Sequence, residues 1–460
     1  MPDCTVLSDL FPPLRRRRIE LSFEGGDISS DAGLLLLQRV DQRLKLTERI
    51  APHLPDDRDP ARITHPTLML LRQRVYGIAQ GYEDLNDHDR LRHDPLFQTA
   101  LQQLAPVASS PTLCRFELRE NRAAAWAIAR ELVEQFIASF AVAPEALILD
   151  FDATDDPVHG QQAGRFFHGY YGHYCFLPLY VFCGEQLLVS YLRPSNIDAA
   201  THSAAIFKLL VRRLRQAWPG VRILFRGDSG FCRQRLLNWC ERHGCHYMLG
   251  LAKNSRLQHF SRWTMSAARE GWAMTGEKQR CFGHYWYAAG SWKRMRRVIA
   301  KAEVTSLGEN PRYVVTNLDG DARQLYDDVY CARGEMENRI KECQLGLFAD
   351  RTSSQHWWAN QFRLFLHAAS LEFALDGGRA EYVLDAPLAP ELLRGKALSP
   401  DATTPPQPDE SGKVKAGKST LLNALIGDEL APTDAGECTK VVAWYTNGNT
   451  YRATLFPSGA

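Results

Sequence analysis

Two apolar stretches of the sequence each lead into a carboxylate, and this repeated pattern constrains the fold more than any other feature of the chain. Residues 147–149 form a short apolar run that Phe151 continues into alternation, as is typical of a buried strand, so Asp150 and Asp152 share one face of it. Residues 222–227 form a second apolar stretch, which ends at Asp228 and a turn that contains glycine. A carboxylate at the edge of a sheet core needs a partner or a cation. The alternative is that Asp150 and Asp152 only cap the turn that follows them.

A third stretch, residues 330–342, has the period of a helix. Four polar side chains recur at intervals that bring them to one helix face. They are Tyr330, Arg333, Glu337 and Lys341. A neighbouring apolar stripe can dock this helix on a sheet, and it consists of Met336, Ile340, Cys343 and Leu347. A carboxylate beside two cations and a tyrosine is poor as core and suits a phosphate site.

Together the three stretches resemble the signatures of DDE insertion-sequence transposases. The resemblance rests on Asp152-Ala-Thr154, on the Arg-Gly-Asp-Ser-Gly-Phe turn around Asp228, and on the Tyr-x-x-Arg-x-x-x-Glu pattern that ends at Glu337. It runs from about residue 19 to about residue 371. One position departs from the pattern: the lysine that such families often carry seven residues after the glutamate is Gln344 here. Lys341 and Glu342 are the candidates for its role.

The resemblance implies a DNA transposase that cuts and joins insertion-sequence ends by two-metal phosphoryl transfer. Its hard oxygen ligands suit Mg²⁺ or Mn²⁺. The implied catalytic and metal-binding residues are Asp152, Asp228 and Glu337, and the implied DNA-binding residues are Tyr330, Arg333 and Lys341. The implied partners are the terminal repeats of the element, target DNA and a second copy of the chain in a synaptic complex. A metal-dependent nuclease with the same core is the alternative enzyme.

The implied fold class is α/β, with an RNase H-like mixed sheet and flanking helices. The expected segments are an N-terminal helical DNA-binding region (1–140), the first part of the core (141–251), a β-rich insertion domain (252–320), the second part of the core (321–371), a linker (372–411) and a truncated GTPase fragment (412–460). Four tryptophans at positions 263–292 alternate with basic residues, so we expect strands there, with most of the rings in the core of the insertion rather than stacked on unpaired bases.

Composition sets the surroundings in which this chain is expected to work. Its 460 residues include 45% hydrophobic ones, enough for two or three domains with real cores. The net charge is only +2, but basic clusters occur at residues 15–18, 212–215 and 293–297, which suits contact with nucleic acid at chosen surfaces. The eleven cysteines show no paired spacing, and no signal peptide or long apolar span is visible. We therefore expect a cytoplasmic protein with reduced thiols and no membrane contact for the transposase part.

The last part of the chain resembles a different protein class, the dynamin-like GTPases. It matches the phosphate-binding loop G-x-x-x-x-G-K-[ST] and a switch threonine. The implied nucleotide-binding residues are Gly412, Gly417, Lys418, Ser419 and Thr439. Prolines replace the strand that normally precedes such a loop, and no later guanine-reading element follows. We expect a fragment that does not hydrolyse GTP. A GTP-binding protein is the alternative function, and whether the fused chain is active stays open.

Overall fold

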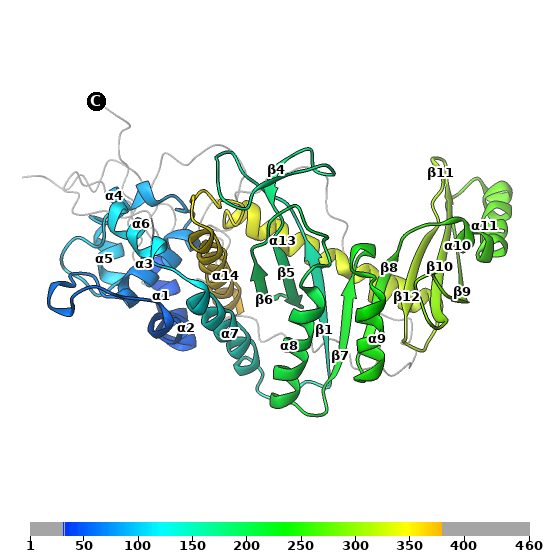
Figure 1. Ribbon diagram of the computed structural model, residues 1–460, viewed down its shortest axis with the longest axis horizontal. Coiled ribbons are helices and arrows are strands. Elements are labelled where there is room, and N and C mark those ends of the chain that lie inside the picture. Colours follow the sequence, from blue (N-terminus) through cyan, green and yellow to red (C-terminus); the bar gives the residue numbers. More distant parts are fainter. Residues whose placement is uncertain (1–30, 32, 380–460) are drawn as a thin grey trace, which may run out of the picture.

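Three parts follow one another along the long axis of the molecule: a helical region, a central sheet and an outer lobe of strands and helices (Figure 1). The computed structural model describes residues 31 and 33–379. The basic cluster at 15–18 and the predicted nucleotide-binding residues Gly412, Gly417, Lys418, Ser419 and Thr439 lie outside the described residues. Within the described ranges, no helix is both long and apolar enough to cross a membrane.

The helical region confirms the helical pattern expected up to about residue 139. Its helices are α1 (Leu34–Leu44), α2 (Leu46–Ile50), α3 (Thr67–Ala79), α4 (His88–Leu91), α5 (Pro95–Ala100), α6 (Ser110–Leu118) and α7 (Arg122–Ala138), with short 3-10 turns at Ala51–His53, Pro60–Arg62 and Leu85–Asp87. Several starts are capped as the sequence dictates. The Asp94 carboxylate accepts from the N–H groups of Leu96 and Phe97, and the Asn121 side chain caps α7 in the same way.

The central sheet has the strand order β6, β5, β1, β7, β8. These strands are β1 (Ala146–Ala153), β5 (Leu179–Cys183), β6 (Gln186–Tyr191), β7 (Arg222–Gly227) and β8 (His246–Leu251). β1 runs antiparallel to β5 and parallel to β7, and β8 is parallel to β7. This arrangement confirms the predicted mixed α/β sheet with flanking helices. A small second sheet, β2 (Asp156–Pro157), β4 (His173–Phe176) and β3 (Phe166–His168), stands beside the end of β1.

The alternation along β1 assigns its two faces. Leu149 and Phe151 pack into a core with side chains of α7, α8 (Ser203–Ala217) and α9 (Gln234–Arg242). The opposite face of the sheet is covered by α13 (Gly334–Gly346), by α14 (Trp357–Arg379) and by the segment from α12 (Ala322–Gln324) through a π-helical turn, Leu325–Tyr330, and a 3-10 turn, Cys331–Arg333. Asp150 and Asp152 belong to this second face.

The predicted insertion is an extension of the same sheet, and its first part is helical. After β8 come α10 (Ser255–Phe260) and α11 (Arg262–Thr275), and then β9 (Gln279–Tyr287), β10 (Arg296–Thr305), β11 (Gly308–Glu309) and β12 (Arg312–Thr316). β12 pairs with β8, so the sheet runs on without a break. The prediction of strands was wrong for 255–275, where Met265 and Ala268 pack as one face of a helix against Ala302 and Val304 of β10. Trp292 is buried and Trp272 half-buried, but Trp263 and Trp286 are exposed.

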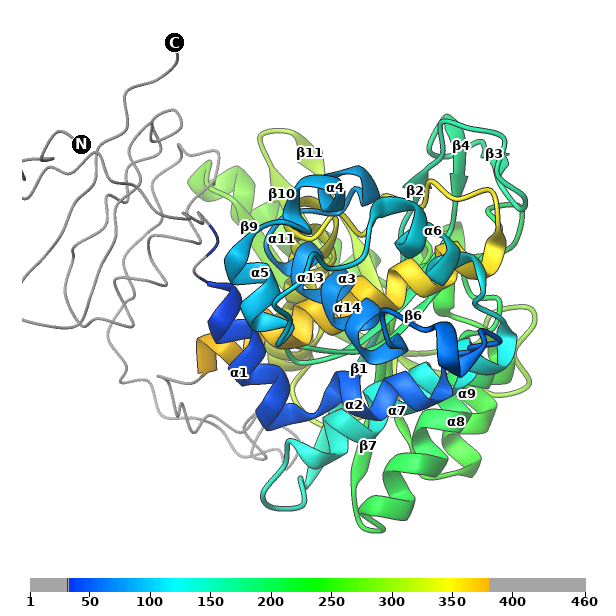
Figure 2. The same ribbon diagram turned by 90° about the vertical axis from the view of Figure 1, so that its left-hand side faces the viewer.

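One long helix, α14, joins the helical region to the sheet (Figure 2). On one side the Gln361 amide accepts from the Leu192 N–H at 2.8 Å and donates to the Ser190 carbonyl at the end of β6. On the other side, the Ser370 hydroxyl donates to the Val75 carbonyl of α3. The helical region and the central sheet are therefore held on opposite sides of one long helix.

Candidate active site

Strand register brings the first two predicted carboxylates together. Parallel pairing sets Asp150 opposite Arg226 and Phe151 opposite Gly227. The next residues in each strand direction, Asp152 and Asp228, therefore emerge at the same edge of the sheet. This is the edge at which ligands of open α/β sheets usually bind. The Asp228 carboxylate also accepts from the Gly230 N–H at 2.8 Å, which stabilises the tight turn after β7.

The third carboxylate arrives on α13. Its apolar stripe docks as predicted, because Met336, Ile340 and Cys343 are buried against Tyr180 and Phe182 of β5. Glu337 stays 46% exposed in its side chain, and it joins the site through Arg333. The Arg333 guanidinium donates to a Glu337 oxygen at 2.5 Å and to an Asp152 oxygen at 3.4 Å. Arg333 thus links the strand carboxylate to the helix carboxylate.

The electrostatics of Asp152 reflect this crowding. Burial, together with the negative charges of Asp228 and Glu337, raises the pKa of Asp152 to about 6, although the Arg333 guanidinium lowers it. The pKa of Arg333 is raised: burial alone would lower it, but Asp152 and Glu337 outweigh that effect. Three carboxylates are therefore close enough to repel one another, with one guanidinium among them.

Tyr330 lies beside the same turn. A side chain on Gly250 would come within 2.7 Å of the Tyr330 hydroxyl and 2.8 Å of the Ser229 amide nitrogen, so glycine at this position of β8 makes room for both. Burial raises the pKa of Tyr330, and nearby Asp228 raises it further while Arg333 lowers it. The phenol therefore stays protonated and can donate a hydrogen bond.

Asp150, the second carboxylate of β1, has a structural partner. It is 3% exposed, and the Arg226 guanidinium donates to its two oxygens at 2.5 and 2.6 Å. Arg226 also donates to the Val329 carbonyl at 2.5 Å, which ties β7 to the segment before α13. Asp150 is therefore buried in a structural ion pair next to the site.

The site contains oxygen donors suited to a divalent cation, but not as a preformed cluster. Within residues 33–379, no three Asp, Glu, His or Cys side chains converge closely enough to hold a metal ion. Arg333 stands between Asp152 and Glu337 instead. The raised pKa of Asp152 is the observation that fits a cation here, since positive charge would relieve the repulsion that Asp228 and Glu337 exert on it.

Lys341 and Gln344, which both follow Glu337 on α13, differ in exposure and in their contacts. Lys341 is exposed one turn further along α13. Gln344, which stands where a lysine was expected, is half-buried and donates to the Asp155 carbonyl at 3.0 Å. Gln344 therefore fixes the backbone just after the Asp152 strand.

Sequence reasoning missed a group of side chains on the small sheet beside β1. The Asp155 carboxylate contacts the His173 ring at 2.8 Å, and Asp155 and Asp152 both raise the pKa of Tyr171 after the effect of burial. Phe167 and Tyr170 on the same hairpin are 57% and 86% exposed. The signal that could have found them is the aromatic and glycine-rich composition of residues 166–174 directly after the acidic strand.

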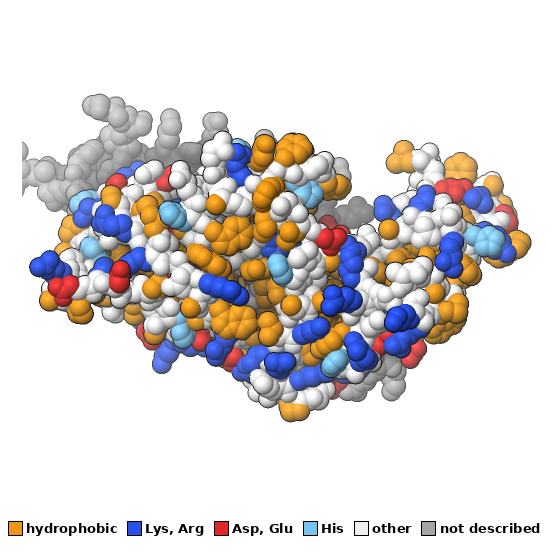
Figure 3. Space-filling view, viewed as in Figure 1, with side chains coloured by type: hydrophobic (Ala, Val, Ile, Leu, Met, Phe, Trp, Pro, Cys, Tyr) orange, Lys and Arg blue, Asp and Glu red, His pale blue; other side chains and the backbone are white. Residues whose placement is uncertain are grey.

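The predicted basic clusters have different fates. Lys and Arg side chains are prominent over α8 and α9 in Figure 3, where Arg212 is exposed. In the cluster at 293–297, Arg296 is buried over the ring of Trp292 and donates to Glu241 at 2.7 Å. Arg294 also contacts Glu241. Arg294 and Arg296 of the cluster at 293–297 therefore stabilise the fold through Glu241.

Comparisons with known proteins add the family. A family model described as "Transposase DDE domain group 1" matches residues 11–375. Two curated proteins named "Isoniazid-induced protein IniC", from the CDC 1551 / Oshkosh and H37Rv strains of Mycobacterium tuberculosis, are 59% identical over 44 residues. That match covers 10% of this chain, and the chain spans only 9% of the length of these relatives.

Among solved structures, a cryo-EM structure of a piggyBac transposase synaptic complex with hairpin DNA aligns with 80% of this chain and 87% of its own. The TM-score of this alignment is 0.34, at 12% sequence identity. The family model, in contrast, spans well over half of the 460 residues. The chain therefore belongs to the family of transposases with a DDE domain.

Proposed function

We propose that this chain is a transposase that cuts and rejoins DNA at the ends of an insertion sequence, with Asp152, Asp228 and Glu337 as its catalytic carboxylates. The observation that carries the proposal is their placement at one edge of the sheet. Two of them emerge from neighbouring parallel strands in register, and the third is joined to Asp152 through the Arg333 guanidinium.

The three carboxylates would hold two divalent cations, Mg²⁺ or Mn²⁺. When bound, such ions activate a water or a DNA 3′-OH and stabilise the leaving oxygen. For Glu337 to become a ligand, its contact with Arg333 has to loosen, which frees guanidinium N–H groups that can donate to a phosphate oxygen. Tyr330 donates from the side of Asp228, and exposed Lys341 supplies charge further along α13.

The proposed partners are the terminal repeats of the element, target DNA and a second copy of the chain that binds the other end. The exposed rings of Phe167 and Tyr170 lie on the hairpin of the small sheet beside β1 and suit stacking on bases at that end. Light scattering with and without end DNA tests the pairing, and a single copy on two joined ends would contradict it.

A nicking assay tests the catalytic assignment. The substrate is a supercoiled plasmid that carries the DNA flanking this chain's own coding sequence, incubated with Mg²⁺. Asp228→Asn and Glu337→Gln should each abolish cleavage and leave DNA binding intact, because a metal ligand is lost without a DNA contact. Glu335→Gln, which changes an exposed carboxylate on the same helix, is the matched control and should cleave normally. Full cleavage by Asp228→Asn would remove the assignment. Cleavage without strand transfer would favour a nuclease.

Arg333→Ala tests the phosphate contact. The slope of log affinity against log salt should become shallower by about one unit, and cleavage should weaken. Arg339→Ala is the control, since Arg339 lies on α13, which directly follows Arg333, but pairs with Glu185 and Glu342. Equal slopes for the two variants would restrict Arg333 to a structural ion pair.

A further inference from the structure

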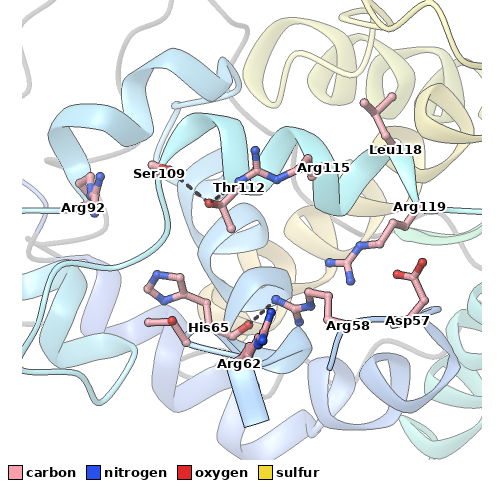
Figure 4. A pocket seen from close by; sticks show the side chains of 11 residues that line it. Asp57, Arg58, Arg62, His65, Arg92, Ser109, Thr112, Arg115, Leu118 and Arg119 are labelled. Carbon is pink, nitrogen blue, oxygen red and sulfur yellow. Dashed lines mark hydrogen bonds between the residues drawn. The ribbon is translucent and has the colours of Figure 1, made fainter. Parts of the chain in front are cut away.

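A basic pocket lies in the helical region, apart from the carboxylates (Figure 4). It has a volume of about 610 Å³ and is lined by the segment before α3, by the residue that follows α4 and by α6. Its lining includes five arginines, which are Arg58, Arg62, Arg92, Arg115 and Arg119, and a single carboxylate, Asp57. Such an excess of guanidinium groups around one cavity points to an anionic ligand.

Carboxylates outside the lining do not neutralise this charge. Asp56 contacts both Arg58 and Arg119, at 2.6 and 2.7 Å, and Asp59 lies 3.5 Å from exposed Arg62. With these two and Asp57 counted, five guanidinium groups still face three carboxylates.

Three of the arginines have N–H groups that are free to bind a ligand. In the described part of the chain, neither Arg92 nor Arg115 forms an ion pair, and Arg115 donates only to the Thr112 hydroxyl at 3.3 Å. The Nε–H groups of Arg92 and Arg119 are buried without an acceptor among the described residues. Burial lowers the pKa of His65, and nearby Arg92 and Arg58 lower it further, in keeping with the excess of arginines in the lining.

The lining favours phosphate groups over a whole nucleotide. Planar guanidinium groups match phosphate oxygens two at a time. The hydroxyls of Ser109 and Thr112 at the start of α6 add neutral donors at the positive end of that helix. The lining contains no Phe, Tyr or Trp on which a base could stack.

The pocket is mechanically connected to the catalytic sheet. Phe116 of α6 packs edge-on against Phe362 of α14, with ring centroids 5.4 Å apart. Glu117 of α6 accepts from Arg363 of α14 at 2.7 Å. Since Gln361 anchors α14 on β6, a ligand in the pocket is held at a fixed position relative to the carboxylates.

We propose that this pocket binds backbone phosphates of duplex DNA and so holds the DNA while its end lies at the carboxylates. The proposal rests on the proposed function. Cleavage is not needed to test it, however, because binding can be measured on the catalytically silent Asp228→Asn chain.

The experiment measures fluorescence anisotropy of a labelled duplex from the flanks of the coding sequence at several salt concentrations. In the full-length Asp228→Asn chain, adding Arg92→Ala and Arg115→Ala should lower the salt slope by about two units, one for each lost phosphate contact. The matched control adds Arg39→Ala and Arg130→Ala, which remove the same charge from exposed positions of α1 and α7. The control should change the slope far less.

Further arms separate the alternatives. Arg92→Lys with Arg115→Lys should restore the slope, because lysine keeps the charge. Circular dichroism should show that all variants are folded. Equal slopes for pocket and control variants would overturn the proposal. Thermal unfolding with and without inorganic pyrophosphate is measured on the same variants. If the pocket variants bind DNA normally but are no longer stabilised by pyrophosphate, the pocket holds a small phosphate ligand and the proposal is overturned. A wild-type chain that binds DNA through the pocket but never cleaves it would contradict only the proposed function.

Discussion

The ionised form of the Asp152 side chain is destabilised by burial and by the negative charges of Asp228 and Glu337. Its pKa is about 6, against 3.8 for an unperturbed carboxyl, so the folded chain binds the proton more tightly than the unfolded chain. This contribution to stability is fully present below about pH 4 and is lost as pH rises through about 6. Above that pH the ionised carboxylate costs at most about 3 kcal/mol, from roughly 1.4 kcal/mol for each pH unit.

Asp152→Asn should therefore stabilise the metal-free protein at pH 7.5 more than at pH 4. Urea unfolding at the two pH values measures the difference, which should reach up to about 3 kcal/mol. Added Mn²⁺ should stabilise the wild type and not the variant. A stability difference independent of pH would contradict the electrostatic account.

Asp150 should respond in the opposite way. Asp150→Ala leaves the Arg226 guanidinium buried without its carboxylate, and breaking a buried pair from one side costs about 3–5 kcal/mol. Unfolding midpoints in urea should fall sharply for Asp150→Ala and should hold or rise for Asp152→Ala. If both variants are equally stable, the distinction between a supporting and a functional carboxylate fails.

At the scale of elements, α14 depends on a buried charge cluster that joins three helices. Glu117 of α6 accepts from Arg74 of α3 at 2.8 Å and from Arg363 of α14 at 2.7 Å. Glu117→Gln should cost about 3–5 kcal/mol, because the buried Arg74 and the partly buried Arg363 guanidinium groups both lose their counter-charge. Urea unfolding checks this, with exposed Glu335→Gln as the control. A loss equal to that of the control would show that the cluster does not hold the helices together.

Local pattern predicted most of the elements around the site. Period-two alternation correctly assigned the shared face of Asp150 and Asp152, and the stripe at Met336 and Ile340 correctly docked α13. The pattern did not predict the partner of Asp150, since Arg226 lies 76 residues away and only strand register brings it near. It also misjudged 255–275, where tertiary packing on β9 and β10 favours helices for a sequence rich in aromatic residues.

At the scale of the whole molecule, every residue of the candidate active site and of the basic pocket precedes the end of α14. The contacts that hold these two sites together also lie before residue 379, from Glu117 and Phe116 to Gln361 and Ser370. We therefore expect the proposed function to be independent of residues 412–460, because the contacts on which it rests all lie within the described residues 33–379.

A chain that lacks 412–460 should bind end DNA with the affinity and salt slope of the full chain. Residues 412–460 also contain the predicted nucleotide loop, but prolines replace the strand that normally precedes such a loop. The full chain should therefore show no GTP hydrolysis and at best millimolar GTP binding, about −4 kcal/mol. Anisotropy and calorimetry measure the two quantities, with Lys418→Ala as the control for the loop. Micromolar GTP affinity that Lys418→Ala abolishes would make the loop a working site, and DNA binding that falls on truncation would extend the DNA contacts beyond α14.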